Sequence, residues 1–149
     1  MSHAYSQLFD SVRVILFHKQ STSAMTRFLR LDGGELVIGG ELPKLSQVVA
    51  SDDPDDASVL SHPASIAAEI ERWLGLESGD LEVEPDYRER IEVPDKVLRV
   101  YLARFKTIDP PFAEAEAVGG SFVTLTQTRG ATPVELELLR SAYTMIMEG

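Results

Sequence analysis

The chain has 149 residues, of which 44% are hydrophobic and 26% charged, a balance that favours one folded globular domain over disorder. With 24 acidic and 14 basic residues the formal net charge is -10, which argues against general binding to nucleic acid or to anionic membranes. Cysteine is absent, which excludes disulfides and thiolate metal sites, and neither a signal peptide nor a membrane span is apparent, so we expect a cytoplasmic protein.

The first part of the chain is rich in short apolar runs that predict strands. These runs cover residues 12–17, 25–31 and 35–38. Asp32-Gly33-Gly34 predicts a turn between the last two strands, and Gly39-Gly40 then interrupts the pattern. A pair of glycines permits a positive φ or a close approach of the backbone to a ligand.

A polar, acidic stretch follows these strands. Residues 42–50 are compatible with a strand or a loop. Residues 51–63 carry four aspartates around Pro54 and predict a loop insertion.

A helix is predicted at residues 64–74, because apolar residues recur there at helical spacing. The stripe consists of Ile66, Ile70, Trp73 and Leu74. Gly75 suits the position directly after a helix. Further strands are predicted at 81–84, 87–93, 97–105 and 121–126, and a short helix at 110–118. A last helix begins with Thr132 as N-cap and Glu135 completing a capping box, so the order predicts an α+β fold in one domain over residues 1–149.

Two segments resemble the signature of Nudix hydrolases. The first is Gly39-Gly40-Glu41, which follows the predicted hairpin. The second is the 68–76 segment, which retains the family's residues at four positions: Glu69, Ile70, Gly75 and Leu76. The order of elements over residues 12–148 is similar to that family as well. This resemblance implies a Nudix-like mixed β-sheet sandwiched between helices, with a divalent metal ion bound at the helix.

The second segment departs from the family at the residues that hold the metal. Ala68 stands where the family has an arginine, and Arg72 and Trp73 stand where it has two adjacent metal-binding glutamates. Residues at i, i+3 and i+4 share a helix face, so three carboxylates so placed suit Mg²⁺. Here the face carries one carboxylate, one cation and one indole, and no Glu-Glu pair occurs anywhere in the chain. The sequence therefore predicts that pyrophosphohydrolase chemistry is absent or weakened.

The retained scaffold and the lost metal ligands lead to a first hypothesis. The chain would be a non-catalytic protein with a degenerate Nudix box that binds a nucleotide-like or phosphorylated small molecule, or a protein partner, without a cofactor. Its ligand-binding residues would be Gly39, Gly40, Glu41, Glu69, Arg72 and Trp73. Arg72 would supply a fixed positive charge, or else pair with Glu69 at the surface. Trp73 would stack on a base, or else anchor the core.

Two alternative hypotheses use the same residues differently. In one, an active hydrolase of nucleoside-diphosphate-linked compounds holds Mg²⁺ or Mn²⁺ through a rebuilt set of Glu41, Glu69 and Glu71, with or without aspartates of the 52–56 loop. Glu69 is then the candidate catalytic residue. In the other, the chain is a protein interaction module or a homodimer, which a large exposed apolar patch would favour.

Overall fold

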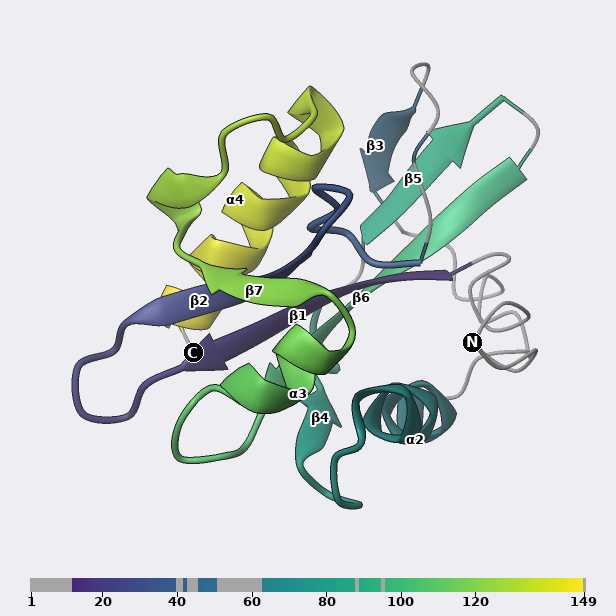
Figure 1. Ribbon diagram of the computed structural model, residues 1–149. Coiled ribbons are helices and arrows are strands. Elements are labelled where there is room, and N and C mark those ends of the chain that lie inside the picture. The colour runs from purple at the N-terminus through teal and green to yellow at the C-terminus, as the bar shows by residue number, and fades with distance from the viewer. Residues whose placement is uncertain are drawn as a thin grey trace.

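A mixed sheet of seven strands forms the centre of the molecule (Figure 1). The computed structural model describes residues 12–39, 42, 46–50, 63–87, 89–94 and 96–148. The strands are β1 (Val12–Lys19), β2 (Thr26–Leu31), β3 (Gln47–Ala50), β4 (Leu81–Val83), β5 (Glu89–Val93), β6 (Lys96–Phe105) and β7 (Gly120–Val123). Their order is β3-β5-β6-β1-β2-β7, and β4 pairs with β6. The β1–β6 pair is parallel and the other pairs are antiparallel.

Helices cover both faces of this sheet. They are α2 (Pro63–Leu74), α3 (Phe112–Ala117) and α4 (Pro133–Glu148), with a short 3-10 helix, η2 (Leu125–Gln127), before α4. Figure 1 shows α4 on one side of the sheet and α2 and α3 on the other. The predicted α+β class, with a mixed sheet between helices, is confirmed. Among the described residues, no helix combines the length and the apolar character that crossing a membrane requires.

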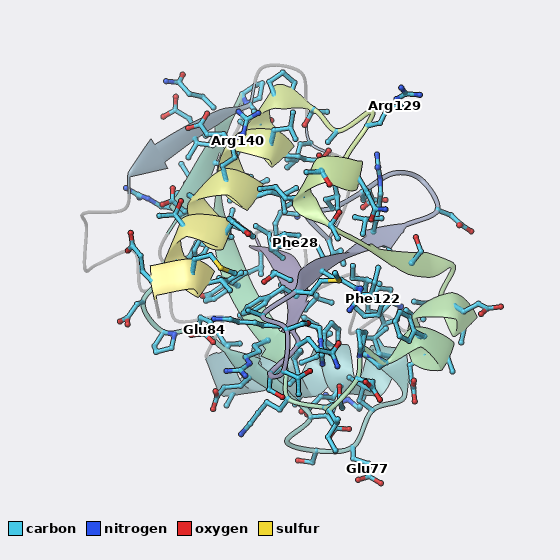
Figure 2. All side chains as sticks on the ribbon, turned by 90° about the vertical axis from the view of Figure 1, so that its left-hand side faces the viewer. Phe28, Glu77, Glu84, Phe122, Arg129 and Arg140 are labelled. Carbon is cyan, nitrogen blue, oxygen red and sulfur yellow. The ribbon has the colours of Figure 1, made fainter. Side chains whose placement is uncertain are left out.

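The alternation of side chains along the central strand builds two cores. Val14 and Leu16 of β1 pack with α2, whereas Ile15 and Phe17 pack with α4. Burying one such side chain contributes roughly 1.5–3 kcal/mol, so both helical layers are held mainly by apolar contact. Phe28 of β2 lies near the middle of the molecule, in the α4-side core, while Arg129 and Glu77 lie at its periphery (Figure 2).

The helix ends follow local signals that the sequence contains. α2 begins at Pro63 and is followed by Gly75, whose φ is 74°. The amide of Leu76 donates to the carbonyl of Glu71 at 2.8 Å, which closes the end of the helix in a Schellman motif. In α4 the amide of Glu135 donates to the Thr132 hydroxyl at 3.2 Å, and the amide of Thr132 donates to the Glu135 carboxylate at 3.1 Å. This reciprocal pair is the predicted capping box.

The prediction of a strand at 35–38 is wrong. The chain bends at Leu36 and Val37, and Ile38 makes an isolated bridge with Val14 of β1. Leu36 and Val37 enter the α4-side core and Ile38 enters the α2-side core, so consecutive side chains do not alternate as they would on a strand. The predicted strand at 121–126 also ends early, at Val123, because Thr124 caps η2 through the side chain of Gln127.

Candidate functional site

Gly39 lies where the central sheet opens between β1 and β2. These strands pair only from Phe17 to Lys19, opposite Thr26 to Phe28. Nearer its start, β1 is bridged instead by Ile38, whose amide donates to Val14 at 2.7 Å and whose carbonyl accepts the Val14 amide at 2.9 Å. Ile38 shares a core with Ile66 and Ile70 of α2. The Ile38 side chain therefore packs on the α2 side of the sheet, and Gly39 follows it directly in the chain.

A buried carboxylate from α4 holds the segment before Gly39. Oε2 of Glu135 accepts the backbone amides of Leu36 at 3.0 Å and Val37 at 3.3 Å. The side chain is 8% exposed, and its other oxygen belongs to the capping box. The Glu135 carboxylate thus accepts the hydrogen bonds of two backbone amides that a neighbouring strand would otherwise accept. Gly39 itself has a φ of 132°, a conformation that side chains rarely adopt.

The degenerate helix face carries an ion pair. Arg72 donates to Oε1 of Glu69 one turn earlier, and this is the pairing expected for i and i+3. The Arg72 side chain is 68% exposed and that of Glu69 is 22% exposed. Trp73 is half-buried and packs against the α2-side core, which agrees with a core anchor. The cation of this pair is therefore accessible from solvent, whereas its carboxylate is largely covered.

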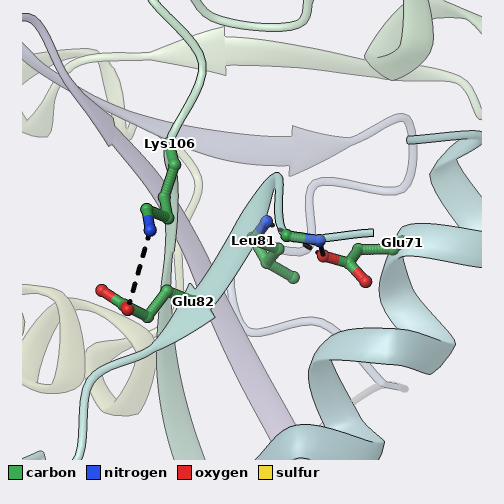
Figure 3. Close-up of polar contacts among 5 residues, drawn as sticks. Glu71, Leu81, Glu82 and Lys106 are labelled. Carbon is green, nitrogen blue, oxygen red and sulfur yellow. Dashed lines mark hydrogen bonds and ion pairs between the residues drawn. The ribbon is translucent and has the colours of Figure 1, made fainter. Parts of the chain in front are cut away.

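Glu71 stabilises the fold from a different side of α2. It is 7% exposed, and its Oε2 accepts the amides of Gly79 at 2.9 Å and Leu81 at 3.1 Å. Figure 3 shows the side chain reaching from α2 to the start of β4. Residues two apart do not face each other on a helix, so Glu71 and Glu69 point in different directions. Glu71 is consequently a poor partner for Glu69 in a rebuilt metal site.

The structure describes some of the candidate residues and not others. Glu69, Arg72 and Trp73 lie together on α2, Glu71 points elsewhere, and Gly40 and Glu41 lie outside the described residues. Of the predicted acidic loop at 51–63, residues 51–62 are also outside them, and Pro63 begins α2. Within the described part of the chain, no three histidine, aspartate or glutamate residues are close enough to hold a metal ion. The roles of Glu135 and Glu71 as acceptors for distant amides escaped sequence reasoning, although the capping box did single out Glu135.

Comparison with known proteins adds no relative: no protein-family model matches the chain, and no curated protein matches its sequence.

Proposed function

We propose that the chain is a Nudix-like protein with a degenerate metal site. It binds a nucleotide-like or phosphorylated small molecule between the Gly39 segment and α2 and does not hydrolyse it. The observation that carries this proposal is the ion pair of Glu69 and Arg72. An arginine stands where the resemblance places a metal-binding glutamate, and it occupies the one carboxylate of that face.

The exposure of the pair favours an anionic ligand over a cation. A guanidinium that is 68% exposed presents N–H donors to an incoming phosphate, and its planar fork suits phosphate oxygens. A divalent cation approaching Glu69 would meet Arg72 first and be repelled. Arg72 thus attracts the ligand's phosphate as a fixed positive charge, in the role that a bound metal ion has toward a pyrophosphate.

The hydrolase alternative has less support. The engagement of Glu71 with Gly79 and Leu81 leaves Glu69 as the single described carboxylate of the rebuilt set. One carboxylate is a small part of the oxygen shell that Mg²⁺ prefers. We therefore favour ligand binding over catalysis as the function.

Titration with ADP in the presence of EDTA, followed by amide NMR, tests the proposal. Saturable shifts at Gly39 and at Glu69 to Trp73 are expected without any divalent metal. Arg72→Ala should weaken binding roughly tenfold or more, since a hydrogen bond to a charged group contributes about 1.5–3 kcal/mol. Arg140→Ala is the matched control, because Arg140 is an exposed arginine on α4, across the sheet.

Two outcomes would contradict the proposal. One is equal weakening by both substitutions, which would indicate a loss of general charge only. The other is turnover of ADP-linked compounds when Mg²⁺ is added, seen by phosphorus NMR as new phosphate signals.

A further inference from the structure

Two large apolar side chains are exposed within one short stretch of the chain, where β6 leads into α3. Ile108 is 84% exposed, and Phe112, four residues later, is 54% exposed. No other large apolar side chain in the described part of the chain is more than 45% exposed. Figure 1 shows the connection before α3 as a loop that projects at the lower left. Single exposed apolar residues are ordinary, whereas a group of them marks an interaction surface.

Hydrogen bonds fix the turn that carries Ile108. His18 of β1, which is buried, donates through Nε2 to the carbonyl of Thr107 at 2.8 Å. The Gln20 side chain donates to the carbonyl of Ile108 at 3.4 Å and to Oδ1 of Asp109 at 3.1 Å. The Thr107 hydroxyl donates to the carbonyl of Asp109 at 2.7 Å. The exposed side chain therefore stands on an ordered backbone, so binding a partner there costs less conformational entropy.

A row of aromatic rings holds Phe112. Its ring meets that of Phe122 edge to face, with centroids 5.6 Å apart, and Phe122, labelled in Figure 2, meets Phe105 in the same way at 5.6 Å. Phe105 is 1% exposed and belongs to the α2-side core. Such ring pairs are favourable beyond the area that they bury. Phe112 is therefore anchored to the core while half of its surface faces solvent.

Carboxylates flank both exposed side chains. Asp109 directly follows Ile108 and is exposed. Glu116 is exposed one turn after Phe112, on the same face of α3. Between residues 107 and 128 the sequence contains no lysine, arginine or histidine. We call Ile108, Asp109, Phe112 and Glu116 the α3 patch.

The cations near the α3 patch leave its charge negative. Lys106 precedes the turn and forms an ion pair with Glu82 at 3.9 Å. Arg27 of β2 donates to the Gln20 side chain at 3.3 Å, and this one guanidinium is outnumbered by the carboxylates of the patch and of Glu114. In the segments outside the described residues, acidic side chains also outnumber basic ones. The local field thus has the sign of the whole chain.

This charge decides which occupant fits the α3 patch. In an isologous dimer the same patch meets itself, so a second copy would bring carboxylates against carboxylates. Anionic lipid and nucleic acid would be repelled as well. A protein segment that presents apolar side chains between lysines or arginines would match both the apolar centre and the acidic rim.

We propose that the α3 patch is a docking surface for a partner protein that presents apolar side chains flanked by lysine or arginine. The inference goes beyond the proposed function, because it uses neither Gly39 nor the ion pair of Glu69 and Arg72.

A short synthetic peptide of leucine and lysine that forms an amphipathic helix is the probe, added to the full chain and followed by amide NMR and calorimetry. Saturable shifts are expected from residue 107 to 122. Ile108→Ser combined with Phe112→Ser should weaken binding roughly tenfold or more, because a few exposed apolar anchors supply most of the affinity of such surfaces. Met147→Ser, at an exposed apolar position of α4 across the sheet, should leave affinity within about twofold.

A second pair of variants tests the acidic rim. Asp109→Asn combined with Glu116→Gln should weaken binding roughly threefold to tenfold at low salt, with a smaller effect at high salt. Glu137→Gln combined with Glu148→Gln removes the same charge from exposed positions of α4 and should have less than half that effect. The same peptide with serine in place of leucine should not bind saturably.

Several results would overturn the inference. Shifts spread over the acidic surface, with equal losses in the two charge variants, would show general attraction only. Unchanged affinity after Ile108→Ser with Phe112→Ser, in a protein whose other amide signals are unmoved, would exclude the patch, as would the absence of saturable binding. Sedimentation that shows a dimer of the wild type and a monomer of this variant would assign the patch to a second copy instead.

Discussion

The carboxylate of Glu135 accepts the backbone amide of Leu36 across a distance of 3.0 Å, and so joins the first turn of α4 to the segment before Gly39. These residues are 99 positions apart in the chain. The link crosses from the helical layer on one side of the sheet to the opening between β1 and β2. The geometry of the proposed ligand site therefore depends on a helix that does not belong to it.

Removing the Glu135 carboxylate should destabilise the protein strongly. Glu135→Ala leaves the buried amides of Leu36 and Val37 without their acceptor and breaks the capping box, a combined cost of about 3 kcal/mol. Urea denaturation measures the free energy of unfolding. Glu137→Ala, on the exposed side of the same helix, should change it by less than about 0.5 kcal/mol. Equal effects of the two substitutions would show that the link is unimportant.

Substitutions of Glu71 and of Glu69 should distinguish a residue that stabilises the fold from a residue of the proposed ligand site. Glu71→Ala removes the acceptor for the amides of Gly79 and Leu81 and should cost about 2–3 kcal/mol of unfolding free energy. Glu69→Gln should cost less than about 0.5 kcal/mol, since its pairing with Arg72 is at the surface. Chemical denaturation and ADP titration of both variants give the comparison. A stable Glu71→Ala protein that has lost its ligand would instead make Glu71 a site residue.

The acid dependence of stability should include a contribution from Glu89. Burial, and then the nearby carboxylate of Glu137, raise the pKa of Glu89 above its ordinary value of 4.5. The folded state therefore prefers the protonated form. The stability that this preference contributes is present below pH 4.5 and is lost as the pH rises through the raised pKa.

Glu89→Gln removes the titrating carboxylate and with it the loss of stability at higher pH. The variant should be more stable than the wild type at neutral pH by a few tenths of a kcal/mol, a small figure because the group is partly exposed to solvent. The difference should close as the pH falls below 4.5. Thermal unfolding between acid and neutral pH provides the measurement, and Glu137→Gln should act in the same direction. If the stability difference between the variant and the wild type widens toward acid pH, the direction assigned to the pKa shift of Glu89 is wrong.

Restoring the missing carboxylates should restore a metal site. Arg72→Glu combined with Trp73→Glu places three glutamates at i, i+3 and i+4 on one face of α2. We expect Mn²⁺ to bind this variant roughly tenfold or more tightly than the wild type. Arg140→Glu with Thr144→Glu adds the same charge to exposed positions of α4 and controls for general attraction of cations.

Trp73 contributes to packing, so Arg72→Glu alone is made as well. It should give a weaker gain in a protein of nearly unchanged stability. No gain in either variant, with the fold intact, would mean that the motif was aligned in the wrong register.

Sequence patterns predicted the elements whose signals are local. The β-branched run at the start of β1, the apolar stripe of α2 with Gly75 after it, and the capping box of Thr132 and Glu135 each depend on residues within one or two turns. The i to i+3 pairing of Glu69 with Arg72 follows from helix geometry in the same way. These local elements of the fold and the pairing of Glu69 with Arg72 were confirmed.

Contacts between distant segments could not be predicted from one sequence. Residues 35–38 have the composition of a strand, but the amides of Leu36 and Val37 donate to Glu135 from another layer. Nothing near Glu71 indicates that it caps the start of β4. The pairing of Arg90 with Arg99 requires the register of β5 and β6, which one residue of slippage would change.

The proposed function requires that the metal site has been lost while the surrounding site persists. Titration of the wild type with Mg²⁺ and then with paramagnetic Mn²⁺ at near-neutral pH, followed by amide NMR, tests it most directly. We expect no localised shift or broadening around Gly39 or from Glu69 to Glu71. Saturable broadening centred on these residues would contradict it and establish a rebuilt metal centre.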